Sequence, residues 1–105
     1  MMFLLMPPMP WRFVMSKKIK SKKKILDLGC GAHKVSPEAI GVDIIKFAGV
    51  DIVYDLNKVP YPFKKEEFDE VCAYMILEHL EDVEASMVEI YRLLKPGGIL
   101  YVKVP

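Results

Sequence analysis

The chain has 105 residues, of which 52% are hydrophobic, 28% charged and 10% aromatic, and its formal net charge is +1. Because this length supports one domain with one core, we expect no second lobe, and the composition argues against an intrinsically disordered chain. Residues 25–105 contain no internal repeat and no low-complexity segment.

The charges are unevenly distributed along the chain. Residues 1–24 carry seven basic residues and no acidic one, whereas residues 25–105 carry eight basic and 14 acidic residues. A basic arm before an acidic body can contact nucleic acid or anionic lipid, but a solubilising leader on an enzyme body is the favoured interpretation. Nucleic acid is the weaker hypothesis for a partner, because the lysine run of residues 17–24 lacks interleaved aromatic residues.

The first 15 residues, MMFLLMPPMPWRFVM, are apolar, but we expect no membrane span there. Pro7, Pro8 and Pro10 interrupt the run, and a span needs about 20 uninterrupted apolar residues. A signal peptide would carry its charge before the apolar run, whereas here the charge follows it. We therefore expect residues 1–23 to form a disordered or basic extension and residues 24–105 to form the domain, with Met15 as an alternative start.

Five apolar runs predict five strands in the rest of the chain. They are KILDL at 24–28, AIGVDII at 39–45, VDIVYDL at 50–56, FDEVCAYM at 68–75 and GILYVKVP at 98–105. Continuous apolar runs are typical of strands buried on both faces, so the sequence predicts a parallel sheet of the α/β class. In such a sheet the ligand site lies at the carboxyl ends of the strands.

The first two connections between these runs are too short for crossover helices. About ten and about five residues are available, whereas a parallel crossover ordinarily takes a dozen or more. We expect at most one helical turn at 36–39, with Ser36 as its cap and Pro37 at its first position, and an extended return over 46–49. An antiparallel hairpin over 40–55 is the alternative.

One long helix is predicted before the last strand. Apolar residues at helical spacing mark it, namely Val83, Met87, Ile90, Tyr91 and Leu94. Asp82 is available as its cap, and the segment Lys95-Pro96-Gly97-Gly98 ends it.

Polar residues gather at the predicted carboxyl edge of the sheet. They are Asp27 with Gly29 and Gly31, then Asp43, then Asp55, then Tyr74 with Glu78 and His79. Glycines after a buried strand let a ligand approach the backbone, and an acid on the neighbouring strand can accept both hydroxyls of a ribose. A nucleoside site is therefore indicated. A dinucleotide site is disfavoured, because Lys34 stands where a third glycine belongs and Asp43 follows too closely.

Four stretches follow one another between residues 25 and 105, namely ILDLGCG, GVDI, YDLNKVPYPFKKEEFDEV and ILEHLEDVEASMVEIYRLLKPGGILYVKVP. Together they resemble the class I S-adenosylmethionine-dependent methyltransferases, of the small-molecule, type 11-like kind. The resemblance implies a Rossmann-like sheet of strand order 3-2-1-4-5. It also implies S-adenosylmethionine as cofactor and transfer of its methyl group to an unidentified small-molecule acceptor.

The resemblance also implies roles for single residues. Asp27, Gly29 and Gly31 correspond to the loop that holds the methionyl end of the cofactor, and Asp43 to the acid that holds the ribose. Asp55 and Leu56 correspond to the pair beside the adenine, and Tyr74 to the end of the fourth strand under the methionyl group. His33 departs from the small residue usual at its position, which leaves the details of that loop open.

A purely structural role is the alternative interpretation for several of these residues. Gly29 and Gly31 can be turn glycines, and Asp55 can cap a turn. Cys30 and Cys72 lack metal-ligand or disulfide spacing, so we interpret them as small core residues of a protein in the reducing cytoplasm.

A metal site is not expected. Some members of the family hold a divalent metal with Glu-x-x-Glu-His, but Met75 stands at the first of these positions here, which leaves only Glu78 and His79. His79 is the candidate general base, needed only if the acceptor loses a proton, although a packing role is favoured. The catalytic residues are otherwise unassigned.

The chain ends directly after the fifth predicted strand, whereas complete family members continue with a helix and an antiparallel strand pair. The resemblance thus predicts a truncated chain, or a non-catalytic cofactor-binding or partner-regulating module as the alternative. Residues 99–104 would form an apolar sheet edge in which Lys103 is the only charged residue, and such edges tend to pair with another strand. We expect a homodimer through this edge.

Overall fold

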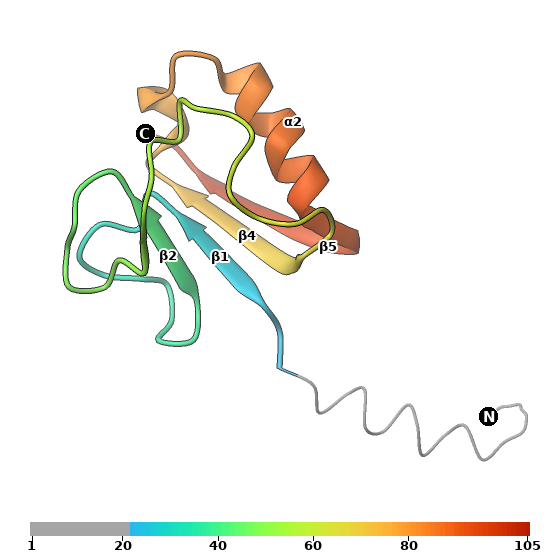
Figure 1. Cartoon of the computed structure of the whole chain (residues 1–105), viewed down its shortest axis with the longest axis horizontal. Coiled ribbons are helices and arrows are strands. Elements are labelled where there is room, and N and C mark those ends of the chain that lie inside the picture. The colour runs from blue at the N-terminus through green and yellow to red at the C-terminus, as the bar shows by residue number, and fades with distance from the viewer. Residues whose placement is uncertain (1–21) are drawn as a thin grey trace, which may run out of the picture.

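The computed structural model describes residues 22–105, which form a five-stranded parallel sheet with a helix against one face (Figure 1). The elements are β1 (Ile25–Leu28), β2 (Ile40–Asp43), β3 (Ile52–Val53), β4 (Phe68–Tyr74), the 3₁₀ helix η1 (Leu77–His79), α2 (Val83–Leu93) and β5 (Leu94–Lys103). The expectations for residues 1–21 lie outside the described part of the chain, and the domain boundary at residue 24 stays a prediction.

The strand order is β3-β2-β1-β4-β5, with every neighbouring pair parallel, which confirms the predicted class and order. β1 lies at the centre, where Leu26 pairs with Ile40 of β2 on one side and with Val71 of β4 on the other. The antiparallel hairpin considered for residues 40–55 is wrong, because β2 and β3 pair in parallel from Val42 with Ile52 onward.

The connections from β1 to β2 and from β2 to β3 are loops without a helix, as their length requires. The turn expected at 36–39 forms, closed by the Ala39 amide, which donates to the Ser36 carbonyl at 3.2 Å. The prediction that Ser36 caps it is wrong, because the Ser36 hydroxyl is buried and has no hydrogen-bond partner. Because no helix follows, there are no free helical amides from which the Ser36 hydroxyl could accept a hydrogen bond.

Helix α2 begins as predicted, with the Asp82 carboxylate accepting the Ala85 amide at 3.0 Å. Of the apolar residues that located the helix, only Ile90 is among those that the helix buries. Its buried residues are Ser86, Glu89, Ile90 and Leu93, whereas Val83, Met87 and Tyr91 are exposed. A charged residue takes an inward position here because Glu89 pairs with Arg92 and accepts the Tyr61 amide, so its burial leaves no charge without a partner.

Strand β5 begins at Leu94, immediately after α2, and not at residue 98 as expected. Leu94 pairs with Phe68, and the next pair is Glu70 with Ile99, so residues 95–98 form an irregularity within the strand. Pro96 cannot donate to the ladder and Gly97 has φ +81°, which explains why regular pairing is interrupted there. α2 therefore ends at Leu93, just before the Lys-Pro-Gly-Gly segment predicted to end it, and that segment lies within β5.

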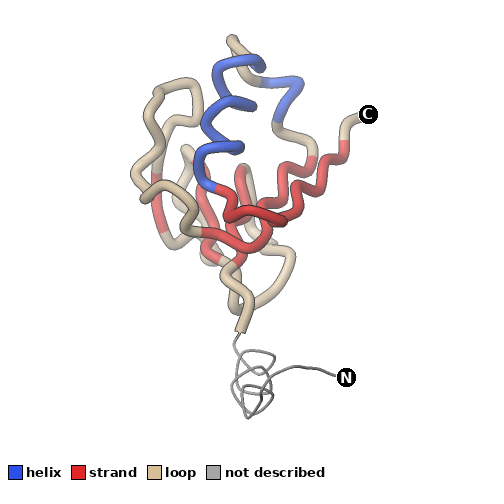
Figure 2. Tube along the Cα trace, turned by 90° about the vertical axis from the view of Figure 1, so that its right-hand side faces the viewer, coloured by secondary structure: helices blue, strands red, loops and turns tan. Residues whose placement is uncertain are grey.

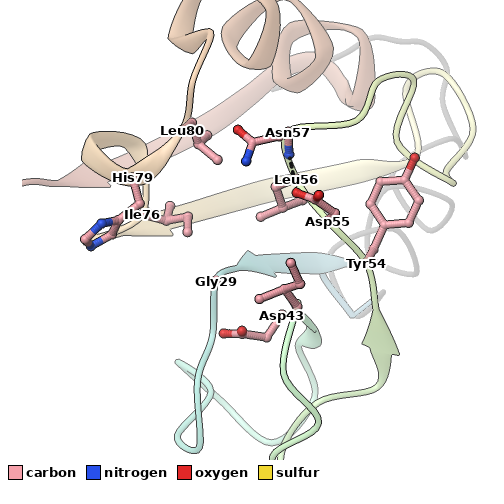
Figure 3. Close-up of a pocket in the computed structure, with 10 residues that line it drawn as sticks. Gly29, Asp43, Tyr54, Asp55, Leu56, Asn57, Ile76, His79 and Leu80 are labelled. Atoms are coloured by element: carbon pink, nitrogen blue, oxygen red, sulfur yellow. Dashed lines mark hydrogen bonds between the residues drawn. The ribbon is translucent and has the colours of Figure 1, made fainter.

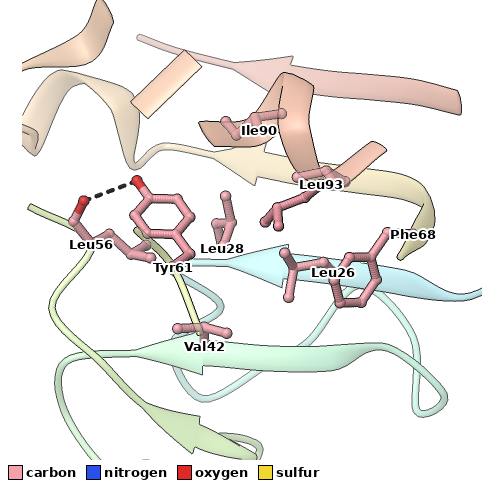
Figure 4. Packing of buried hydrophobic residues seen from close by; sticks show 9 residues of the cluster. Leu26, Leu28, Val42, Leu56, Tyr61, Phe68, Ile90 and Leu93 are labelled. Atoms are coloured by element: carbon pink, nitrogen blue, oxygen red, sulfur yellow. Dashed lines mark hydrogen bonds between the residues drawn. The ribbon is translucent and has the colours of Figure 1, made fainter. Parts of the chain in front are cut away.

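Figure 2 shows the helix on one side of the strands. The core lies between the sheet and α2, on the face that the helix covers (Figure 4). Leu26 and Leu28 of β1 pack there with Ile90 and Leu93 of α2. The loop before β4 adds Tyr61, whose hydroxyl donates to the Leu56 carbonyl at 2.9 Å. Between residues 22 and 105, no helix combines the length and the apolarity needed to cross a membrane.

Candidate functional site

A cleft opens at the carboxyl edge of the sheet, where β1, β2, β3 and β4 all end (Figure 3). Its volume is about 420 Å³ including the open solvent at its mouth. Ten residues line it: Gly29, Asp43, Ile44, Tyr54, Asp55, Leu56, Asn57, Ile76, His79 and Leu80.

Gly29 forms the floor of the cleft, directly after β1. Its φ is +68°, and a Cβ built on it would lie 2.8 Å from Cγ1 of Ile76, so both the backbone and the space require glycine. Gly31 also has positive φ, +61°, but a Cβ there would meet nothing within 4 Å. The turn interpretation therefore holds for both glycines, while Gly29 in addition lines the cleft.

Asp43 ends β2 and holds the neighbouring loop. Its Oδ2 accepts the Gly31 amide at 2.9 Å, and its Oδ1 accepts the Ile45 amide at 3.2 Å. A carboxylate offers about four lone-pair positions, so two are not used by these amides. Asp43 is thus a ligand candidate that is already fixed in orientation by backbone amides.

Asp27 lies behind the loop and is not among the residues that line the cleft. It is buried, with 2% of its surface exposed, and its Oδ2 accepts the Val35 amide at 2.8 Å. Burial raises the pKa of Asp27, and the Val35 hydrogen bond opposes part of that shift. In this structure, Asp27 anchors the far end of the loop that begins at Gly29.

Asp55 and Leu56 line the cleft from the segment after β3. The Asp55 Oδ1 accepts the Asn57 amide at 3.0 Å, so the turn-capping interpretation of Asp55 is correct for one of its oxygens. Asn57, which sequence reasoning missed, accepts the Glu81 amide at 2.9 Å and joins this segment to the chain after η1. The Asp-x-Asn pattern, typical of such turns, could have identified it.

Three apolar side chains that sequence reasoning also missed, Ile44, Ile76 and Leu80, form walls of the cleft. Ile44 directly follows Asp43 and is 60% exposed, a high value for an isoleucine. Ile76 reaches Gly29 because the chain bends at Met75, where φ is +58°. No local sequence pattern predicts that bend, so the sequence does not indicate that Ile76 lines the cleft.

Two further predicted residues lie at or beyond the rim. His79 lines the cleft with a side chain that is 71% exposed, and its Nε2 lies 3.7 Å from Oε2 of Glu78. Tyr74 ends β4 outside the lining, with the Lys103 Nζ 5.7 Å from its ring centroid. The structure thus brings Gly29, Asp43, Asp55, Leu56 and His79 together, and leaves Asp27, Gly31 and Tyr74 outside.

The lining of the cleft is acidic and apolar. Among its ten described residues there is no lysine and no arginine, which suits a ligand without phosphate better than a nucleotide. In residues 22–105 no three His, Cys, Asp or Glu side chains come together as a metal-ligand set. Cys30 and Cys72 are buried and unbridged, in agreement with their interpretation as core residues, and burial raises the pKa of both thiols.

Comparison with known proteins gives consistent matches. A family model described as a methyltransferase domain matches residues 9–105. A ubiquinone biosynthesis O-methyltransferase of Rhodopseudomonas palustris is 30% identical over 75% of this chain and 38% of its own length. A demethylmenaquinone methyltransferase of Chlorobaculum parvum is 27% identical over 90% of this chain and 48% of its own length.

A solved structure of an S-adenosylmethionine-dependent methyltransferase from Thermotoga maritima is similar in fold, with a TM-score of 0.62 and 25% identity. The match covers 83% of this chain and 46% of that one. The chain therefore spans less than half the length of each of these three relatives.

Proposed function

Since the chain belongs to the methyltransferase-domain family and has the fold of the class I S-adenosylmethionine-dependent methyltransferases, we propose that its cleft binds S-adenosylmethionine for transfer of the methyl group to a small molecule. The observation that carries the proposal is the composition of the cleft. A glycine floor, two carboxylates and apolar walls meet at the carboxyl edge of a parallel sheet.

The residues present fit a sulfonium nucleoside. Asp43 offers acceptor positions to the two hydroxyls of a ribose, since its remaining lone pairs are unused by the chain. Ile44 and Leu56 offer apolar surface to a flat base. The acidic lining favours the positive charge of a sulfonium, and the absence of lysine and arginine from the described lining matches a ligand that has no phosphate.

When bound, S-adenosylmethionine supplies an activated methyl group on a good leaving group. The protein's own contribution is then mostly positioning, because an in-line displacement gains most from correct orientation of the two reactants. Asp43 fixes the ribose. Gly29 leaves room for Ile76, which forms a wall of the cleft beside the ligand. If the acceptor is a hydroxyl, His79 at the rim is the candidate to take its proton.

A small-molecule acceptor is supported by the relatives, whose names refer to ubiquinone biosynthesis and to demethylmenaquinone. We extend this to a phenolic or quinone-like acceptor as the first class to assay. Transfer to such acceptors, measured with a radiolabelled methyl group, tests this part of the proposal separately from cofactor binding.

Calorimetry with S-adenosylmethionine and S-adenosylhomocysteine tests the binding proposal. We expect both to bind, and Asp43→Ala to weaken binding by about 1–3 kcal/mol, the cost of losing hydrogen bonds to a charged acceptor. Glu84→Ala, on the exposed side of α2, is the matched control. Absence of heat and of a thermal shift at millimolar ligand in a folded sample would remove the cofactor proposal. Binding without transfer to any acceptor would favour the non-catalytic alternative.

A further inference from the structure

Lys34 lies just beyond the glycines, at the position where a phosphate-binding loop would carry its third glycine. Its side chain does not line the cleft. The Lys34 Nζ instead donates to the Asp51 carboxylate at 2.9 Å, to the Ala39 carbonyl at 2.9 Å and to the Pro37 carbonyl at 3.4 Å. Because an ammonium has three N–H donors, these three acceptors use its full capacity within the chain.

Asp51 is fixed in turn to β2. The same oxygen that accepts Lys34 accepts the Gly41 amide at 2.8 Å, and the Asp51 amide donates to the Gly41 carbonyl at 2.9 Å. Lys34 therefore ties three segments together, namely the loop after β1, strand β2 and the entry to β3. The Gly41 amide, followed by Lys34, lowers the pKa of Asp51, so this carboxylate is charged at neutral pH.

Two glycines leave room for the lysine side chain. A Cβ on Gly41 would lie 2.7 Å from the Lys34 Cδ, and a Cβ on Gly49 would lie 3.5 Å from its Cγ. The alkyl chain thus lies against two positions that carry no side chain, and only 16% of the Lys34 side chain is exposed. An ordinary exposed ion pair contributes little. Here the Asp51 side chain is 48% exposed, but Lys34 is mostly buried and also donates to two backbone carbonyls.

The segment that Lys34 ties down begins at Gly29, the one residue of the segment that lines the cleft. We call residues 29–35 the glycine loop; its first amides, those of Gly29 and Cys30, donate to the Val42 carbonyl at 2.8 and 3.1 Å. No crossover helix packs behind it, since the connection to β2 is a loop. A loop of this kind keeps one conformation only if specific contacts outweigh its conformational entropy.

We propose that Lys34 and Asp51 form a latch that takes the place of the crossover helix and positions the glycine loop for the nucleoside. Lys34 is then a positioning residue, which acts through Gly29 and Gly31 without touching the ligand. This inference rests on the proposed function of the cleft, but the holding of the loop by Lys34 can be measured without any ligand.

The test compares Lys34→Met with the unchanged protein and with Lys65→Met, which alters a lysine in the loop before β4 at the opposite edge of the sheet. Methionine keeps the alkyl bulk and removes the three donors. We expect Lys34→Met to weaken S-adenosylhomocysteine binding about tenfold, as loss of one charged hydrogen bond or more implies. We also expect faster hydrogen exchange at the Gly29, Cys30 and Gly31 amides and unchanged exchange at Val71 in β4. Lys65→Met changes neither.

A second variant tests whether weaker binding results from loss of the pair of Lys34 and Asp51 and not from a general loss of stability. Asp51→Asn keeps an oxygen for the Gly41 amide and removes the charge that Lys34 meets, so it weakens binding in the same direction. Because the two residues act as one unit, the double variant costs little more than Lys34→Met alone.

Three results would overturn the latch: unchanged loop exchange in Lys34→Met, equal acceleration at Val71 and in the loop, or strictly additive losses in the double variant. If the unchanged protein binds no nucleoside, the proposed function fails, whereas the exchange data still decide whether Lys34 holds the loop.

Discussion

Gly29 and Ile76 meet at the floor of the cleft, so closely that a Cβ at position 29 would lie 2.8 Å from Cγ1 and 2.9 Å from Cβ of the isoleucine. The contact joins the end of β1 to the bend after β4. Because the Ile76 Cβ is close to the backbone, the side chain cannot move aside by rotation of its tip alone. The shape of the cleft therefore depends on the absence of a Cβ at position 29.

Gly29→Ala consequently destabilises the protein more than Gly31→Ala does. Both residues have positive φ, which costs about 1–2 kcal/mol for a residue with a Cβ, but only position 29 adds a steric clash. Urea unfolding of the two variants measures the difference. Equal losses would mean that Ile76 gives way without cost.

The pair of Glu89 and Arg92 predicts a pH-dependent contribution to stability. Arg92 donates from Nε to Oε2 and from Nη2 to Oε1 of Glu89, both at 2.8 Å, and the Tyr61 amide donates to Oε1 at 2.6 Å. Arg92, followed by the Tyr61 amide, holds the pKa of Glu89 below its ordinary value. An acid whose pKa is lowered by folding stabilises the folded state above its unfolded pKa of about 4.3, and this contribution is lost as the pH falls through the folded value.

Glu89→Gln is therefore expected to lower the free energy of unfolding by about 1.5–3 kcal/mol at pH 7, the range for hydrogen bonds to charged groups. The difference from the unchanged protein should shrink as the pH falls below 4. Glu84→Gln, on the exposed side of the same helix, controls for the loss of a charge on α2. A difference that stays constant from pH 7 to pH 3 would contradict this explanation.

Removal of residues 1–20 is expected to leave nucleoside affinity unchanged. The chain enters β1 at the amino edge of the sheet, where Lys23 pairs with Glu70 at 2.9 Å and Lys24 with Glu67 at 2.6 Å. The cleft lies at the opposite edge. Calorimetry on the shortened chain tests this, and a tenfold loss of affinity would show that the basic arm reaches the cleft.

Self-association through β5 remains a prediction. β5 lies at an edge of the sheet, paired only with β4 within the described part of the chain, and Val102 on it is exposed. Exposed apolar edge strands favour pairing with another strand, and a lysine on the edge opposes it. Light scattering over a concentration series should show a dimer that Val102→Lys abolishes and Val88→Lys, on α2, does not. A monomer at high micromolar concentration would contradict the prediction.

Much of the fold could be predicted because its signals are local. Buried parallel strands appear as apolar runs, short connections rule out helices, and Asp82 caps α2 through a contact three residues away. The buried stripe of α2 could not be predicted. It depends on Arg92 and on Tyr61, 28 residues before Glu89, which together make a buried carboxylate acceptable.

The residues of the candidate site likewise fall into those that the sequence predicts and those that it does not. Gly29, Asp43 and Asp55 lie at or just after strand ends, so their positions predict them, whereas Ile76 enters the cleft only because the chain bends at Met75. Lys34 departs from the phosphate-binding pattern in the sequence itself. Its partner Asp51 could not be assigned, because their contact depends on the space left by Gly41 and Gly49.

The central claim is that a nucleoside binds in this cleft, and amide chemical-shift mapping with S-adenosylhomocysteine tests it most directly. We predict that the largest shifts fall on Gly29, Ile44, Leu56 and Ile76, and that amides at the opposite edge, such as those of Lys65 and Gly98, do not move. Shifts concentrated at the opposite edge, or no saturable shift in a folded sample, would contradict the account.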